Sequence, residues 1–204
     1  MAEHFTGLIQ ILEQIDKFSL KPEAANGLIK GVVMIISIMN QDQLKGAVEK
    51  VCVLQVTPLN SIMSNLSAST PKIVKHSVTD PVLYLDRLSA VFRHVQPSNG
   101  CLTEGVAPHP CRGTVESIWP VLSRCLELYQ GDVRVTERTC RTIRFAIRCI
   151  GVQSSSLLQP LVTQLVALYE VKGHSCYLYL GSILVDEYAS ESGCIPGLLS
   201  MLQV

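Results

Sequence analysis

Apolar residues recur at the spacing of α-helices through almost the whole chain, and this periodicity limits the fold more than any other feature. Together with helix-start signals, it predicts nine helices, over residues 5–15, from 22 onward, 42–66, 80–95, 111–129, 133–150, 155–170, 175–188 and from 194 to the end. Polar stretches at residues 67–79 and 96–110 predict two loops. No alternating pattern bounded by Asn-Gly or Asp-Gly turns predicts a strand hairpin. The sequence therefore predicts an all-α fold.

Three of the predicted helices contain a proline before an aliphatic residue, namely Pro58, Pro120 and Pro160. A proline bends a helix because it lacks an N–H donor and crowds the preceding turn. The second and third prolines are 40 residues apart. A bent helix followed by an antiparallel partner at this period is typical of HEAT-type repeats, which stack into an α-solenoid. The alternative is an ordinary helical bundle in which the proline spacing is coincidental.

Composition excludes several other classes of protein. Hydrophobic residues make up 48% of the 204 residues and charged residues only 17%, which excludes a chain that is disordered as a whole. Lys and Arg balance Asp and Glu at 17 each, and aromatic residues make up 5%, which argues against a nucleic-acid partner. The longest apolar run, residues 28–39, contains Lys30 and is too short to cross a membrane. We therefore expect no membrane partner.

The eight cysteines are spread along the chain, and several lie inside predicted helices. This distribution predicts reduced, mostly buried side chains rather than a disulfide framework. His109 and Cys111 form one isolated His-x-Cys pair, and His174 and Cys176 form another. A zinc site needs a further ligand pair at suitable spacing, and the sequence shows none. We therefore expect no metal site and no cofactor.

The predicted helix at residues 133–150 carries five arginines: Arg134, Arg138, Arg141, Arg144 and Arg148. At about 100° per residue, all five fall within an arc of roughly 120°. Isoleucine and alanine side chains occupy the opposite arc, so one face packs and the other presents guanidinium groups. Glu137 offsets part of the charge, whereas Arg144 and Arg148 have no acidic residue three or four positions away. Guanidinium groups favour bidentate binding of phosphate or carboxylate, so this face predicts an anion-binding site.

Two other interpretations of the arginine face remain open at this stage. It is either a solvated surface or a set of ion pairs to acidic residues of a neighbouring repeat. Catalytic motifs of the GxSxG, P-loop, GxGxxG and HExxH types are absent, so we expect no enzymatic activity.

Long strings of the sequence resemble the importin-β family of nuclear import receptors, in particular receptors of the transportin-SR type. The strings are LDRLSAVFRH (85–94), IWPVLS (118–123), ERTCRTIRFAIRC (137–149), LLQPLVTQ (157–164) and HSCYLYLGSILVDEY (174–188). The resemblance spans nearly the whole chain and is most specific from residue 80 onward. It implies a superhelix of HEAT repeats, of which residues 1–204 are expected to form a single segment. The family's N-terminal Ran-binding repeats are expected to be absent from it.

The resemblance also implies a function. Such receptors carry splicing factors into the nucleus by binding their phosphorylated Arg/Ser-rich (RS) domains, and they release this cargo when Ran-GTP binds. An arginine-rich helix of the family contacts the phosphoserines, and the matching residues here are Arg138, Arg141, Arg144 and Arg148. Arg134 is a weaker candidate on the same face. The resemblance implies shuttling between nucleus and cytoplasm, whereas a response of this segment to Ran-GTP is not expected without the N-terminal repeats.

Three classes of function are therefore carried forward. The first is a transport-receptor segment that binds phosphorylated RS domains. The second is an RNA-binding solenoid, and the third is a structural HEAT-repeat scaffold whose arginines pair with neighbouring repeats.

Overall fold

The computed structural model describes residues 2–18, 20–66, 74–75, 77–97, 108–189 and 199. Within these residues every regular element is helical, as predicted. The α-helices are α1 (Ala2–Glu13), α2 (Pro22–Ser37), α3 (Gln41–Leu66), α4 (Pro81–His94), α5 (Arg112–Leu128), α6 (Val133–Ile150), α7 (Ser155–Lys172) and α8 (Ser175–Tyr188). Short 3-10 turns, η1 (Ile15–Phe18) and η3 (Gly151–Ser154), follow α1 and α6. The helix predicted from residue 194 lies outside the described residues, apart from the single residue 199.

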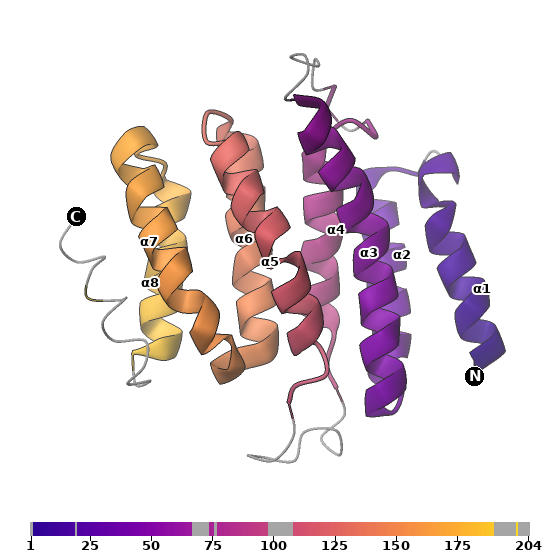
Figure 1. Ribbon diagram of the computed structural model, residues 1–204. Coiled ribbons are helices and arrows are strands. Elements are labelled where there is room, and N and C mark those ends of the chain that lie inside the picture. Colours follow the sequence, from indigo (N-terminus) through magenta and orange to yellow (C-terminus); the bar gives the residue numbers. More distant parts are fainter. Residues whose placement is uncertain are drawn as a thin grey trace.

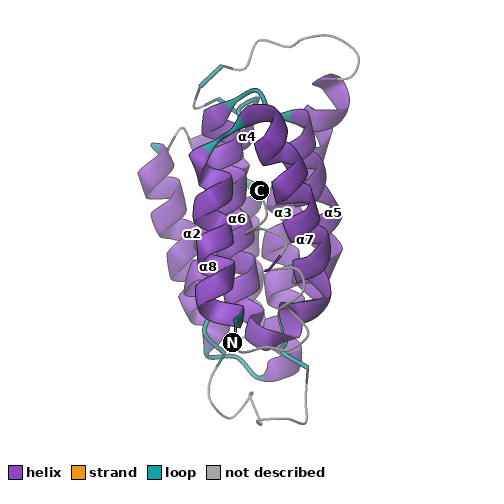
Figure 2. Cartoon of the chain, turned by 90° about the vertical axis from the view of Figure 1, so that its left-hand side faces the viewer, coloured by secondary structure: helices purple, strands orange, loops and turns teal. Residues whose placement is uncertain are grey.

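The helices stack in two layers along the chain (Figure 1). Helices α3, α5 and α7 form one layer, and α2, α4, α6 and α8 form the other, as the view from the α7–α8 end shows (Figure 2). The most extensive contacts join each helix to its antiparallel partner or to its neighbour in the same layer, above all α4 to α6. Pairs of antiparallel helices that stack on the next pair are the arrangement predicted from the sequence.

The three prolines lie where the repeat interpretation requires them. Pro58, Pro120 and Pro160 lie inside α3, α5 and α7, which are the first helices of three successive pairs. Each proline removes one N–H donor from the middle of its helix, so one carbonyl of the preceding turn loses its intrahelical partner. The common position within each pair shows that the 40-residue spacing reflects a structural repeat.

Local signals at the helix ends account for most of the predicted boundaries. The carboxylate of Asp80 accepts a hydrogen bond from the Val82 N–H (3.1 Å) and caps α4, with proline at the first helical position. Asp132 caps α6 in the same way, accepting from Arg134 N–H and Val135 N–H. At Gly173, which ends α7, the backbone is left-handed with φ of 61°, a conformation that favours glycine.

A continuous hydrophobic core runs between the two layers and joins all four helix pairs. Its fully buried side chains come from both layers, for example Ile29, Leu59, Leu88, Leu126 and Ile143. The six cysteines within the described residues are all free thiols: Cys52, Cys111, Cys125 and Cys140 are buried, and Cys149 and Cys176 are partly buried. This confirms the expectation for those six. Among the described helices, none combines the length and the apolar character needed to cross a membrane.

Candidate functional site

Helix α6 positions the arginines because its other face is tightly packed. Nine of its side chains are buried: Val135, Thr136, Thr139, Cys140, Thr142, Ile143, Ala146, Ile147 and Ile150. The buried threonines are satisfied within the protein. The Thr142 hydroxyl lies 3.0 Å from the Leu85 carbonyl oxygen and 2.9 Å from the Ser89 hydroxyl, both on α4. These small polar contacts allow α4 to pack closely against α6. The close packing holds the arginine face of α6 beside α4.

Three of the five arginines form ion pairs with acidic residues that the helix itself does not supply. Arg134 donates two hydrogen bonds to the buried carboxylate of Asp80, at 2.8 and 3.0 Å. On α4, Asp86 lies 3.6 Å from the guanidinium of Arg138.

The third pair joins α6 to α8, where Arg148 and Glu187 are 2.7 Å apart. The sequence showed no acidic partner for Arg148 because this carboxylate comes from another helix. Arg148 keeps about half of its side chain exposed, at 52%. Ion pairs to neighbouring helices were one of the interpretations left open, and they account for these three arginines.

Arg141 and Arg144 differ from the other arginines of α6. No carboxylate of the described residues lies within ion-pair distance of either guanidinium. Both lie near the ring of Phe145, with guanidinium carbons 5.9 and 4.6 Å from its centroid, and Arg93 of α4 lies 5.5 Å from it. Cation–π attraction to one aromatic ring therefore gathers three positive charges.

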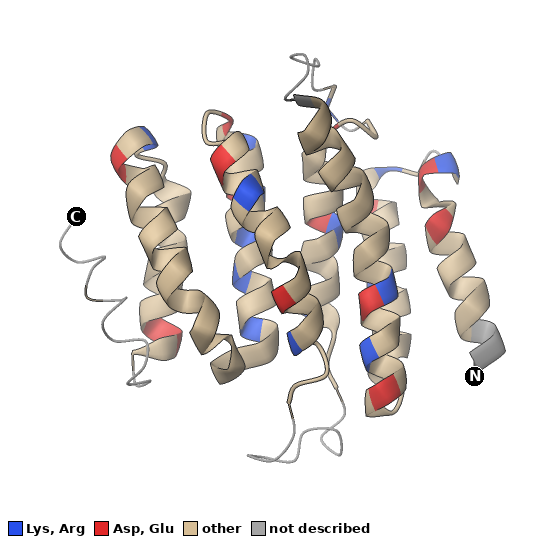
Figure 3. Ribbon diagram, viewed as in Figure 1, with Lys and Arg blue, Asp and Glu red and all other residues tan. Residues whose placement is uncertain are grey.

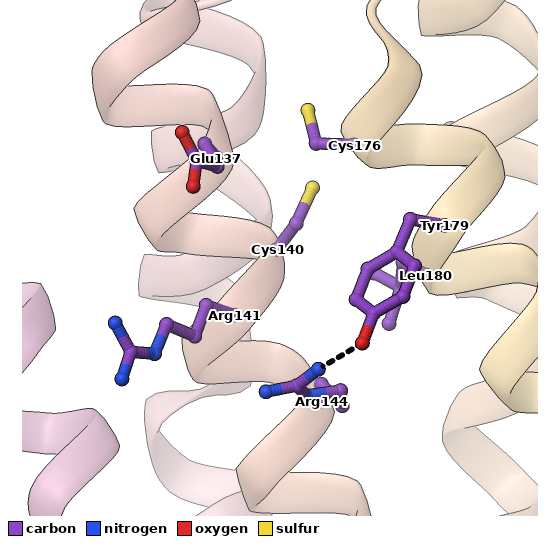
Figure 4. A pocket seen from close by; sticks show the side chains of 7 residues that line it. All are labelled: Glu137, Cys140, Arg141, Arg144, Cys176, Tyr179 and Leu180. Atoms are coloured by element: carbon purple, nitrogen blue, oxygen red, sulfur yellow. Dashed lines mark hydrogen bonds between the residues drawn. The ribbon is translucent and has the colours of Figure 1, made fainter.

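Tyr179 of α8 completes this arrangement. Arg144 donates a 2.7 Å hydrogen bond to the Tyr179 hydroxyl and lies 5.5 Å from the centre of its ring (Figure 4). The Nε–H of Arg144 is buried and has no hydrogen-bond partner. The tyrosine orients this guanidinium but does not neutralise it, because a phenol is uncharged at neutral pH.

Two adjacent depressions lie on either side of Arg141. The first, of about 160 Å³, lies between α6 and α8 and is lined by Glu137, Cys140, Arg141, Arg144, Cys176, Tyr179 and Leu180. The second, of about 240 Å³, extends to α4 and α2 and is lined by Asn26, Gly27, Lys30, Asp86, Ser89, Ala90, Arg93, His94, Arg141 and Phe145. We call the cationic residues of this region, Lys30, Arg93, Arg141 and Arg144, the basic surface.

The electrostatics of the basic surface are dominated by these four cations. Burial and the positive charges of Lys30 and Arg93 lower the pKa of His94, so this imidazole is neutral at pH 7. Burial raises the pKa of Asp86, although Arg138 and Arg141 oppose the shift. Figure 3 shows basic positions at successive turns of α6. The arrangement is suited to binding a polyanion by charge-assisted hydrogen bonds.

The structure divides the four arginines predicted to bind cargo. Arg141 and Arg144 lie together on the basic surface, whereas Arg138 and Arg148 flank it in ion pairs. Sequence reasoning missed Arg93 and Tyr179, which come from other helices and gave no local signal. Phe145 had a signal, since helical spacing places it on the same face as the arginines.

A second cluster lies away from the basic surface. The isolated His109–Cys111 pair of the sequence is joined in the structure by Cys149 of α6, and the three possible ligand atoms lie within 4.8 Å of one another. The sequence showed no sign of this third residue, because Cys149 follows Cys111 at a distance that no short metal-binding motif covers.

Comparisons with known proteins place these features in context. Residues 109–204 match the family described as the Transportin-3/Importin-13 fourth TPR domain. The chain is 21% identical to Transportin MOS14 of Arabidopsis thaliana over 186 residues, which cover 91% of this chain and 18% of that protein. The chain thus spans under a fifth of the length of this relative.

These similarities confirm the resemblance drawn from the sequence strings and the all-helical, importin-β-type repeat fold. The family's name refers to TPR rather than HEAT repeats, and both are stacks of antiparallel helix pairs. Transportins are transport receptors without enzymatic activity, so the expectation that the chain is not an enzyme is also confirmed.

Proposed function

We propose, from the match of residues 109–204 to the transportin-3/importin-13 family, that the basic surface binds phosphorylated RS domains of cargo proteins that enter the nucleus. The protein that contains this segment then shuttles between nucleus and cytoplasm. Ran-GTP is proposed as a partner of the whole receptor and is not assigned to this segment. The relative is named a transportin, which supports transport but specifies no cargo.

The observation that carries the proposal is the group of three guanidiniums around Phe145. Arg93, Arg141 and Arg144 lie within 6 Å of one ring, and no ion pair neutralises them in the described part of the chain. Gathering like charges costs free energy, which a bound anion recovers. Lys30 extends the charge toward α2.

Phosphorylated RS domains fit this surface in charge and spacing. Each phosphoserine adds about −1.5 to −2 charges and three strong acceptor oxygens. In an extended Arg-Ser repeat, successive phosphoserines are about 6–7 Å apart at 3.2–3.4 Å per residue. Arg141 and Arg144 are about 4.5 Å apart along the axis of α6 at 1.5 Å per residue. Neighbouring phosphates can thus contact different guanidiniums.

Within the proposal, the four predicted arginines have two kinds of contact. Arg141 and Arg144 bind phosphate directly. Arg138 and Arg148 lie at the rim, where they reach cargo only by sharing their guanidiniums with Asp86 and Glu187. Substitution of the first two should therefore weaken binding more than substitution of the last two.

The test is fluorescence anisotropy with a labelled Arg-Ser repeat peptide, phosphorylated or not, and with single-stranded RNA as a competitor. We expect salt-sensitive binding of the phosphorylated peptide only. Arg141→Ala and Arg144→Ala should each weaken it by about tenfold, which corresponds to about 1.4 kcal/mol and lies near the lower end for a charged hydrogen bond because the site is partly exposed.

A matched control removes two arginines from the opposite layer. On α5, Arg124 is exposed and Arg112 is partly exposed in a surface ion pair with Glu116, so Arg112→Ala/Arg124→Ala lowers the net charge equally without touching the basic surface. An equal loss of affinity in this control would show that overall charge, rather than the basic surface, accounts for the effect. If Arg141→Ala/Arg144→Ala bound the phosphopeptide as tightly as the original chain, the proposal would be wrong.

A structural scaffold is the second candidate function, and the ion pairs favour it. Arg134, Arg138 and Arg148 each join α6 to another segment of the stack. A scaffold predicts that arginine substitutions lower the free energy of unfolding and leave peptide binding absent or unchanged. An RNA-binding solenoid instead predicts that RNA displaces the phosphopeptide efficiently.

A further inference from the structure

His109, Cys111 and Cys149 bring one imidazole nitrogen and two thiol sulfurs within 4.8 Å of one another. His109 and Cys111 precede and begin α5, and Cys149 lies in the last turn of α6. Because α5 and α6 are antiparallel, the start of one helix lies beside the end of the other. Cys111 is fully buried, His109 is 9% exposed and Cys149 is partly buried.

The segment that carries the first two residues is held in place by hydrogen bonds. The His109 N–H donates to the side-chain oxygen of Gln153 at 2.7 Å, which fixes this segment to the turn after α6. The Cys111 N–H donates to Nδ1 of His109 at 3.2 Å. Nδ1 of His109 therefore presents a lone pair as the acceptor of this hydrogen bond. Coordination through this atom exchanges the hydrogen bond for a metal bond and moves no ring proton.

We propose that His109, Cys111 and Cys149 bind Zn²⁺ as a structural site of the α5–α6 pair. The ligand set selects the metal, because thiolate and imidazole together suit Zn²⁺, whereas Mg²⁺ and Ca²⁺ require oxygen ligands. In a tetrahedral site with Zn–S of about 2.3 Å and Zn–N of about 2.0 Å, ligand atoms lie about 3.3–3.8 Å apart. The three atoms reach this geometry with side-chain shifts of about 1 Å.

Binding releases the two thiol protons to solvent, so the site carries two thiolates and one neutral imidazole around the cation. Cys52 of α3 is fully buried and interacts electrostatically with Cys111 and Cys149, but its sulfur does not lie within 4.8 Å of all three ligand atoms. The fourth position is therefore filled by a water molecule, or by Cys52 after a shift of its side chain. The site does not depend on the proposed function, since no residue of the basic surface belongs to it.

The test uses the whole 204-residue chain, reduced and treated with a chelator, with Co²⁺ as the spectroscopic probe and Zn²⁺ as the competitor. We expect absorption bands of thiolate-to-cobalt charge transfer and of tetrahedral Co²⁺ at saturation, and their loss when Zn²⁺ is added. Absence of these bands from the original chain would overturn the proposal without reference to any variant.

Two variants localise the metal. Cys149→Ser removes one of the two thiolates, so it should remove about half of the charge-transfer intensity at saturation and weaken Zn²⁺ binding at least tenfold, with circular dichroism to verify that the helices remain. Cys176→Ser is the matched control, because Cys176 is also a partly buried cysteine but lies in the depression between α6 and α8. Retention of the full cobalt spectrum by Cys149→Ser, or its loss in Cys176→Ser alone, would also refute the site.

Discussion

Replacement of Asp80 tests whether the arginine face of α6 stabilises the stack. The Asp80 side chain is 1% exposed, caps α4 through the Val82 N–H and accepts two hydrogen bonds from Arg134. Asp80→Ala removes the cap, at about 1 kcal/mol, and leaves Arg134 without its partner. Breaking a fully buried ion pair costs about 3–5 kcal/mol. Because the Arg134 side chain is 30% exposed and water can solvate it, we expect about 2 kcal/mol here.

The free energy of unfolding should therefore fall by about 3 kcal/mol in Asp80→Ala, measured by urea denaturation with circular dichroism. Asp80→Asn keeps an oxygen for the cap and should lose only the ion-pair part, about 2 kcal/mol. In a double-mutant cycle with Arg134→Ala, the two losses should be non-additive, because both remove the same contact. Fully additive losses, or a loss below 1 kcal/mol in Asp80→Ala, would refute this reasoning.

Four further predictions concern single residues. Burial raises the pKa of Asp86, so its ionised form is disfavoured in the folded chain. The contribution of the protonated carboxyl to stability is therefore lost as pH rises through the folded-state pKa. In urea titrations, the stability of Asp86→Asn relative to the original chain should be higher at pH 7 than at pH 4. The same change should strengthen phosphopeptide binding severalfold by anisotropy, because it removes a negative charge beside Arg141; weaker binding would contradict this. Arg144→Lys keeps the charge but loses the planar contact with Tyr179, so affinity should fall several-fold, and an unchanged Kd would argue against a positioned guanidinium. Gly173→Ala, at φ of 61°, should lower the free energy of unfolding by about 1 kcal/mol, and a stabilised variant in thermal melts would show that the αL cap is not required.

The elements that the sequence predicted well are those specified by neighbouring residues. Asp80, Pro81 and the prolines within the first helices act over one or two turns, so their signals survive in a single sequence. The arc of arginines on α6 was predicted for the same reason, because helical geometry alone decides which residues share a face.

Contacts between helices could not be predicted from neighbouring residues in the sequence. Arg148 showed no acidic residue one turn away, yet Glu187 lies 2.7 Å from it on α8. Arg93 joins the basic surface, and Cys149 joins His109, only through packing of helices that are distant in the chain. The sequence could predict which side chains face outward on one helix, but not which charges of other helices would already compensate them.

The basic surface crosses helices that belong to successive repeats, with Lys30 on α2, Arg93 on α4 and Arg141 on α6. In a stack held mainly by nearest-neighbour contacts, small changes at each junction add up to elastic bending of the whole. An extended anion bound across these three helices would restrain the distances between them and so make the stack stiffer. Ligand affinity and curvature are then linked: bending that widens the row of cations weakens binding, and binding resists that bending.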